Sequence, residues 1–171
     1  MGHVGAMNEP AKPVDDRFKF LVIAMDAPEA RLAAFFAARR AKQSNALVTL
    51  LAIIEPPEFG HWATVAETMR AEAEEAAETL LREFAAEVKA QSGVDPELVI
   101  REGAVTEEIR GLIDEDPSIS ILVLGASAEA AGPGPLVSSL AKNPPYLGLR
   151  PIPVTVVPGS MTRDELRRLA G

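Results

Sequence analysis

The sequence of 171 residues contains no cysteine and no apolar run as long as a membrane span. Without cysteine, disulfides, iron–sulfur clusters and thiol catalysis are excluded, and the composition fits a reducing cytoplasm. A membrane helix needs roughly 18 or more consecutive apolar residues. The formal net charge is -8, whereas nucleic-acid binding needs clustered Lys and Arg. We therefore expect a cytoplasmic protein that binds neither membranes nor nucleic acid.

Sequence motifs for several kinds of chemistry are also missing. The chain has no Walker A loop and no GxGxxG fingerprint, which are the usual phosphate-binding motifs. No triad of nucleophile, base and orienting acid can be argued. Carboxylates are plentiful over Glu67–Glu87, but their helical spacing is typical of a solvated helix face rather than of a metal site. We therefore predict no metal site and no catalytic residues, and expect that the chain is not an enzyme.

Composition divides the chain into three parts. Residues 1–17 carry two prolines, two glycines and several charges, which is typical of a flexible arm. Residues 18–158 hold the apolar segments of one domain. Residues 159–171 form a tail in which Thr162 and Glu165 make up a capping box for a short helix.

Apolar strand-like runs alternate with helical patterns along the domain. This alternation predicts an α/β fold with a parallel sheet that has helices on both faces. The long second helix carries an apolar stripe of Val65, Met69, Ala73, Ala76, Leu80, Phe84 and Val88, with glutamates on its opposite side. Thr106 or its neighbours can cap the third helix. The expected strands are 19–25, 47–54, 97–101, 118–124 and 151–157, and the expected helices are 29–44, 64–91, 105–115 and 136–142.

The segment Ile119–Ser139, ISILVLGASAEAAGPGPLVSS, is the best candidate for a binding site. A buried-looking strand ends at Gly125 and leads into a loop of glycines, prolines and serines. Ligands of open α/β sheets bind beyond the carboxyl ends of strands, where free backbone N–H groups can hold an anion. Gly125 could equally be a simple turn between strand and helix. Asp26, at the end of the first strand, could orient a ribose or a metal, or could cap the following helix.

Four segments together resemble the universal stress protein family over about residues 18–158. They are the first strand ending in Asp26, the second strand LVTLLAII, the segment Val99–Ile109 and the fourth strand with its glycine turn, ILVLGAS. The resemblance implies a doubly wound five-stranded parallel sheet of strand order 3-2-1-4-5. It also implies a binding or signalling role in the stress response.

ATP-binding members of that family carry Gly, two residues, Gly, nine residues, then Gly-Ser or Gly-Thr. Counted from Gly125, this register places Ala128 and Ser138 where the family has glycines, and Ser139 at the final hydroxyl. If position 128 needs a left-handed backbone, alanine costs roughly 1–2 kcal/mol there. Pro133 and Pro135 also remove two N–H donors from the loop.

We therefore predict weak or absent ATP binding, with an interaction module that has lost its nucleotide as the leading hypothesis. The alternative is an ATP-binding stress sensor that uses the loop Gly125–Ser139, with ATP as its cofactor. The residues that would line such a site, by this resemblance, are Asp26, Gly125, Ser127, Gly132, Gly134, Ser138 and Ser139.

The sequence of the last strand indicates that the chain pairs with a second copy of itself. Val154, Thr155, Val156 and Val157 form a short β-branched strand at the end of the sheet, and such an edge must be covered or paired. Members of the family commonly dimerise through this strand, so we expect a two-fold homodimer. Alternatively, Pro151, Pro153 and Pro158 blunt the edge. An unidentified protein partner is compatible with either arrangement.

Overall fold

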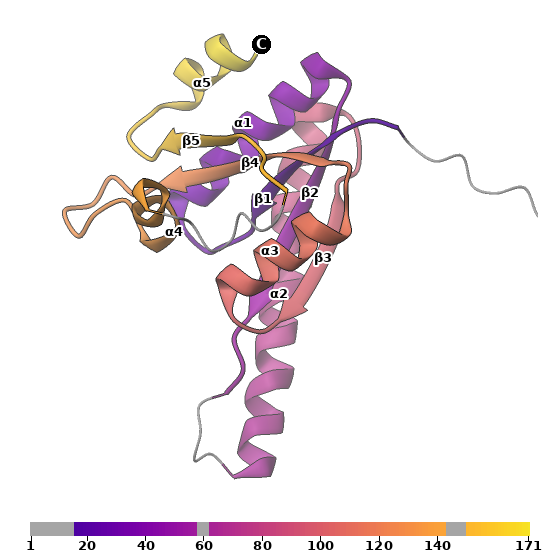
Figure 1. Cartoon of the computed structure of the whole chain (residues 1–171), viewed down its shortest axis with the longest axis vertical. Coiled ribbons are helices and arrows are strands. Elements are labelled where there is room, and N and C mark those ends of the chain that lie inside the picture. The colour runs from indigo at the N-terminus through magenta and orange to yellow at the C-terminus, as the bar shows by residue number, and fades with distance from the viewer. Residues whose placement is uncertain (1–15, 58–61, 143–149) are drawn as a thin grey trace, which may run out of the picture.

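A computed structural model describes residues 16–57, 62–142 and 150–171 of the chain (Figure 1). Five parallel strands form one sheet of order β3-β2-β1-β4-β5, which confirms the predicted α/β fold and strand order. Residues 1–15 of the predicted N-terminal arm lie outside the described residues. The elements are β1 (Lys19–Ile23), α1 (Pro28–Ser44), β2 (Leu47–Ile54), α2 (Ala63–Ser92), β3 (Glu97–Glu102), α3 (Val105–Glu115), β4 (Ile119–Ala126), α4 (Pro135–Ser138), a 3-10 turn (Ser139–Ala141), β5 (Val154–Pro158) and α5 (Arg163–Ala170).

Helices cover both faces of the sheet. Because side chains alternate along a strand, Phe20 and Val22 of β1 join a core under α1, α2 and α5, whereas Leu21 and Ile23 join a core under α3 and α4. Phe35 of α1 is fully buried in the first core. The central strands therefore have nearly continuous apolar sequences, as expected for a sheet that is buried on both sides.

Helix boundaries follow the expected chemistry at most positions. Pro28 is the first residue of α1, Gly93 ends α2 in a left-handed conformation, and the predicted capping box of Thr162 and Glu165 is formed at α5. The predicted cap of α3 by Thr106 is wrong: Ala104 occupies the cap position, with no side-chain bond. The first-turn carboxylates Glu107 and Glu108 favour that helix end instead.

Two strands are shorter than the sequence predicts. β1 ends at Ile23, and Met25 beyond it is exposed. β5 begins at Val154 rather than at Pro151. Proline has no N–H to contribute to a ladder, so the prolines at 151 and 153 delay the strand, although Pro153 accepts a hydrogen bond from Leu122 N–H at 3.0 Å.

The α2 helix extends well beyond the sheet, as Figure 1 shows. Its 30 residues span about 45 Å at 1.5 Å per residue, whereas the longest strands have 8 residues and span roughly 26 Å. The apolar side of α2 is therefore buried only in the second half of the helix. Leu81, Phe84 and Val88 are buried, but Val65 and Met69 remain 46% and 40% exposed because no strand lies beneath them.

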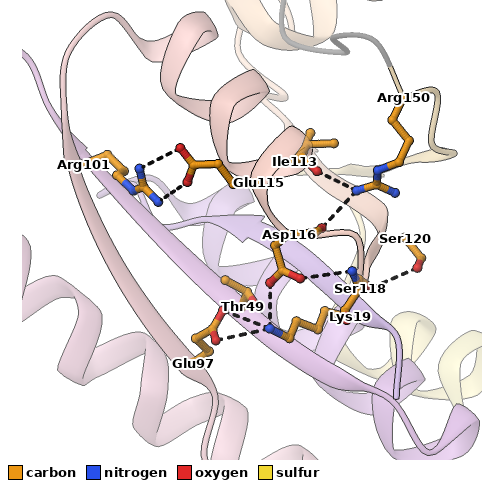
Figure 2. Close-up of polar contacts among 10 residues, drawn as sticks. All are labelled: Lys19, Thr49, Glu97, Arg101, Ile113, Glu115, Asp116, Ser118, Ser120 and Arg150. Carbon is orange, nitrogen blue, oxygen red and sulfur yellow. Dashed lines mark hydrogen bonds and ion pairs between the residues drawn. The ribbon is translucent and has the colours of Figure 1, made fainter. Parts of the chain in front are cut away.

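A network of charges joins the amino ends of three strands (Figure 2). The Lys19 ammonium on β1 lies 2.7 Å from Asp116 Oδ2 and 3.2 Å from Glu97 Oε2. Thr49, the one buried polar residue among those described, donates to Glu97 Oε1 at 3.1 Å. Burial opposes the charge on Lys19, but the hydrogen bonds to Asp116 and Glu97 outweigh that effect and raise the pKa of Lys19. The network therefore fixes β1, β2, β3 and the end of α3 to one another.

Arg150 satisfies the end of α3 in the same region (Figure 2). Its Nη2 donates to the carbonyl oxygens of Ile113 at 2.7 Å and Asp116 at 3.1 Å. The last turn of α3 has no basic residue of its own. Arg150 therefore supplies, from a distant part of the chain, the cation that favours a helix C-terminus.

Replacing Lys19 tests how much this network contributes to stability. Lys19→Met leaves two carboxylates without their cation and should lower the free energy of unfolding by about 1–3 kcal/mol, as is usual for hydrogen bonds to charged groups. Because the pKa of Lys19 is raised, its contribution is present below pH 10.5 and is lost as pH rises through the folded-state pKa. Urea unfolding of both proteins at neutral and strongly alkaline pH measures this difference.

Lys89→Met is the matched control. Lys89 pairs with Asp95 on the open surface, so its loss should change stability by less than about 1 kcal/mol. Equal losses in the two variants would contradict a special role for Lys19.

Candidate functional site

The carboxyl ends of the strands carry two cavities that share no lining residue, and Gly125 lies at the smaller one, where the first turn of α1 contacts β4. A Cβ at Gly125 would lie 2.2 Å from the carbonyl oxygen of Glu29 and 3.0 Å from the backbone nitrogen of Ala30. The first turn of α1 therefore packs directly on the backbone of β4. Glycine at this position is required by close packing, whether or not a ligand binds nearby.

The loop after β4 uses many of its own polar groups internally. Several of its backbone N–H groups donate within the loop, and the Ser139 hydroxyl donates to the carbonyl oxygen of Leu136 at 2.8 Å. Ser127 Oγ accepts from Glu129 N–H at 3.2 Å. A phosphate at this loop would compete with these bonds. The internal backbone bonds are Ser127 N–H to Pro133 at 3.1 Å, Gly132 N–H to Glu129 at 3.1 Å and Ser138 N–H to Gly134 at 2.9 Å.

Left-handed backbone occurs in this loop at two glycines only. Gly132 has φ 110° and Gly134 has φ 99°, conformations that glycine adopts without strain. Ala128 is not among the residues with positive φ. The conformational penalty considered for alanine at this position therefore does not apply, and the substitution would matter only through the approach of a ligand to the backbone.

The smaller cavity lies between this loop and α1. It measures about 90 Å³ and is bordered by Met25, Ala33, Leu124, Leu136 and by other, mostly apolar residues. Glu29 is the one charged side chain among its described neighbours. A mostly apolar cavity with a carboxylate and no cation at its border offers a phosphate no favourable charge.

The larger cavity is a cleft of about 760 Å³ between α2 and the ends of β1 and β2. Ala52 and Ile54 of β2 and Ala73, Ala77 and Leu80 of α2 form its apolar part. Its size falls within the usual range of ligand sites, roughly 300–1,000 Å³. Of the two cavities, this cleft is the one large enough for an organic ligand or a protein segment.

Carboxylates dominate the charged groups of the cleft. Its one cation among the described residues, Arg31, lies 3.0 Å from Glu83 Oε2 and 3.4 Å from Asp26 Oδ1. The hydrogen bond to Glu83 raises the pKa of Arg31. Arg31 is thus engaged by carboxylates already. The acidic residues that line the cleft are Asp26, Glu55, Glu72, Glu75 and Glu83.

The candidate residues from the sequence do not share one cavity. Asp26 lines the large cleft, and Gly125 and Gly134 line the small cavity. Their ligand roles stay predictions. The alternative interpretation of Asp26 as the cap of α1 is wrong. Ala27 occupies the N-cap position of this helix, and no side chain makes a capping hydrogen bond there. The candidates that line neither cavity are Ser127, Gly132, Ser138 and Ser139.

Sequence reasoning missed the acidic lining of the cleft. Glu72, Glu75 and Glu83 were interpreted as part of a solvated helix face. Their helical positions beside Ala73, Ala76 and Leu80 were the available signal. What the sequence could not show is which side of that stripe faces β1 and β2.

The described residues offer neither a metal-binding cluster nor a membrane span. Within residues 16–57, 62–142 and 150–171, no group of three or more His, Cys, Asp or Glu side chains is placed to hold a metal ion. No helix in these same ranges is both long enough and apolar enough to cross a membrane.

Comparison with known proteins gives a consistent answer for the fold. The model of the Universal stress protein family matches residues 17–158. None of the curated proteins matches the chain. The universal stress protein UspA from Lactobacillus plantarum has a similar structure, with a TM-score of 0.66 and 19% identity over 82% of this chain and 97% of its own.

Two further similar structures contain nucleotides. The universal stress protein from Archaeoglobus fulgidus, solved in complex with dAMP, has a TM-score of 0.55 and 15% identity over 82% of this chain and 96% of its own. A universal stress protein family protein from Arabidopsis thaliana, solved with AMP bound, has a TM-score of 0.52 and 18% identity over 86% of this chain and 94% of its own.

The packing at Gly125 leads to a direct test. Gly125→Ala places a Cβ against the backbone of α1 and should destabilise the protein by about 1–3 kcal/mol, the usual cost of overpacking. Gly111→Ala, in α3, is the control: nothing lies within 4 Å of its added Cβ, so it should be neutral or stabilise by roughly 0.5–1 kcal/mol. Thermal unfolding compares the two. A Gly125→Ala protein as stable as the parent would show that α1 shifts at little cost.

Proposed function

The chain belongs to the universal stress protein family, and on that basis we propose that it is a homodimeric binding or signalling module with weak or no affinity for ATP. Its place is the cytoplasm, and its output is contact with another protein rather than a reaction. The observation that carries this proposal is the charge of the large cleft, which is lined by five carboxylates and a single guanidinium that two of them already engage.

Electrostatics argue against a triphosphate in this cleft. At about 8 Å and an effective dielectric constant of 20, two like unit charges repel by roughly 2 kcal/mol before salt screening. A charge-assisted hydrogen bond contributes about 1.5–3 kcal/mol. Each uncompensated carboxylate near the phosphates therefore offsets about one such bond, and Glu72 and Glu75 have no ion-pair partner among the described residues.

The loop after β4 supports the same proposal. Ser127, Gly132 and Ser138 use their N–H groups within the loop, so phosphate binding requires these bonds to break. We assign the loop no catalytic step either. The hydroxyl oxygens of Ser127 and Ser139 bond to the backbone, and neither is directed at a general base.

A nucleotide sensor is the second candidate. It is supported by the similar structures that hold dAMP and AMP and by the position of Asp26 at the cleft. In this version ATP is the cofactor, the ribose lies near Asp26 and the phosphates lie at Gly125–Ser139. Rearrangement of the loop would have to free its N–H groups.

Calorimetric titration with ATP separates the two candidates. We expect no measurable heat, or only millimolar affinity, for the unmodified protein, because of the acidic cleft and the engaged donors. If the loop retains residual binding, the double variant Ala128→Gly, Ser138→Gly should bind more tightly, since glycine lets phosphate approach the backbone. Low-micromolar affinity in the unmodified protein would overturn the proposal in favour of the sensor.

The dimer is proposed through β5. This strand pairs with β4 on one side and is the last strand of the sheet. Val154, Thr155 and Val156 are half-buried, whereas Val157 is buried in the core. An unpaired β-branched edge favours pairing with a second copy around a two-fold axis.

Val156→Glu should convert the dimer into monomers, because a carboxylate on the joined edge loses water without gaining a cation. Sedimentation equilibrium at micromolar concentration measures the mass. Leu98→Glu is the control at the opposite edge of the sheet, since Leu98 on β3 is 46% exposed. A monomeric parent protein would contradict the dimer. If only Leu98→Glu dissociated it, the interface would lie at β3 instead of β5.

A further inference from the structure

The exposed first half of α2 continues the apolar part of the large cleft. Ala73 and Leu80 line the cleft, and Met69 and Val65 follow them at helical spacing towards the N-terminus. Trp62, directly before the helix, is 81% exposed. From residue 62 to residue 80 this stripe spans about 27 Å at 1.5 Å per residue. The cleft thus continues into an apolar strip of Trp62, Val65 and Met69, which is exposed among the described residues.

The residues of the strip suit a protein partner. Large apolar side chains gathered on an exposed surface mark interaction sites. Tryptophan is enriched among residues that anchor interfaces, and methionine adapts its shape to different contacts. Val65 and Met69 remain 46% and 40% exposed, in the half of α2 that extends beyond the sheet (Figure 1).

Charge determines which partner fits. The cleft carries five carboxylates and one guanidinium. Arg70, the nearby cation on α2, is paired with Glu102 of β3 at 3.0 Å. A second copy of this chain would bring the same carboxylates to the contact, and anionic lipid would be repelled in the same way. A cationic segment with one apolar face complements both the carboxylates of the cleft and its apolar strip.

We propose that the cleft between α2 and the ends of β1 and β2, extended by Trp62, Val65 and Met69, docks a basic amphipathic helix of a partner protein. This inference rests on the proposed function as an interaction module and names its partner class. The apolar face of the helix lies along the strip, as in other helix-in-groove complexes. Its Lys and Arg side chains reach Glu72, Glu75 and their neighbours.

A designed peptide of about 18 residues, the length that matches the strip, provides the probe. Its leucines repeat at i, i+3, i+4 and i+7, and lysines fill the remaining positions. Two comparison peptides are a scrambled sequence of the same composition and a version with glutamate in place of lysine. Fluorescence anisotropy at about 0.15 M ionic strength limits non-specific attraction. We expect dissociation constants on the order of micromolar for the designed peptide and at least roughly tenfold weaker binding of both others.

Variants of α2 locate the binding. The double variant Glu72→Lys, Glu75→Lys should bind the designed peptide roughly tenfold or more weakly than the parent, because both residues line the cleft. Glu74→Lys with Glu78→Lys is the matched control: it makes the same change of net charge on exposed residues of the same helix that do not line the cleft. Its affinity should stay within about twofold of the parent. Met69→Ser should also weaken binding, which charge attraction alone would not predict.

Three results would overturn the inference: no binding of the designed peptide at about 100 µM, equal binding of the scrambled peptide, or equal loss in the two double variants. If the protein binds neither the designed peptide nor ATP, this partner class is excluded and the proposed function still holds. Low-micromolar ATP binding overturns the proposed function itself, whatever the peptide does. The two failures are therefore distinguishable.

Discussion

The carboxyl edge of the sheet is organised around the direct contact between β4 and the first turn of α1. Only glycine at position 125 allows it, because any Cβ would overlap the backbone of Glu29. A cavity of about 90 Å³ lies beside this contact and the loop after β4, and a separate cleft of about 760 Å³ lies towards α2. The candidate residues Asp26 and Gly125, which the sequence suggests together, therefore line different spaces.

The second organising feature is the mismatch between a 30-residue helix and strands of at most 8 residues. The second half of α2 is held by Leu81, Phe84 and Val88, whereas the first half leaves its apolar side chains in solvent. With the carboxylates on the same helix, this excess length forms the surface that we propose for docking a partner helix. The family fold thereby carries a cleft lined by five carboxylates and one guanidinium, which is the basis of both proposals.

Much of the fold could be predicted because its signals are local. The strand 47–54 and the helix 105–115 have the predicted bounds, since continuous apolar runs and turn residues determine them within a few positions. The capping box at Thr162 is likewise a contact over three residues. The cap of α3 was misassigned to Thr106 because the pattern does not show which residue begins the helix. Periodicity likewise identifies the apolar side of α2, but does not show that Val65 and Met69 on that side remain exposed.

The sequence by itself determined the order of the strands along the chain, the absence of thiol chemistry, the net charge of -8 and the replacement of two family glycines by Ala128 and Ser138. The tertiary structure alone decided that Ser127, Gly132 and Ser138 use their N–H groups within the loop, that Lys19 joins Asp116 and Glu97, and that five carboxylates face one cleft. The reason is physical: composition and period are properties of neighbouring residues, whereas charge in a cleft depends on segments that meet only when the sheet is formed.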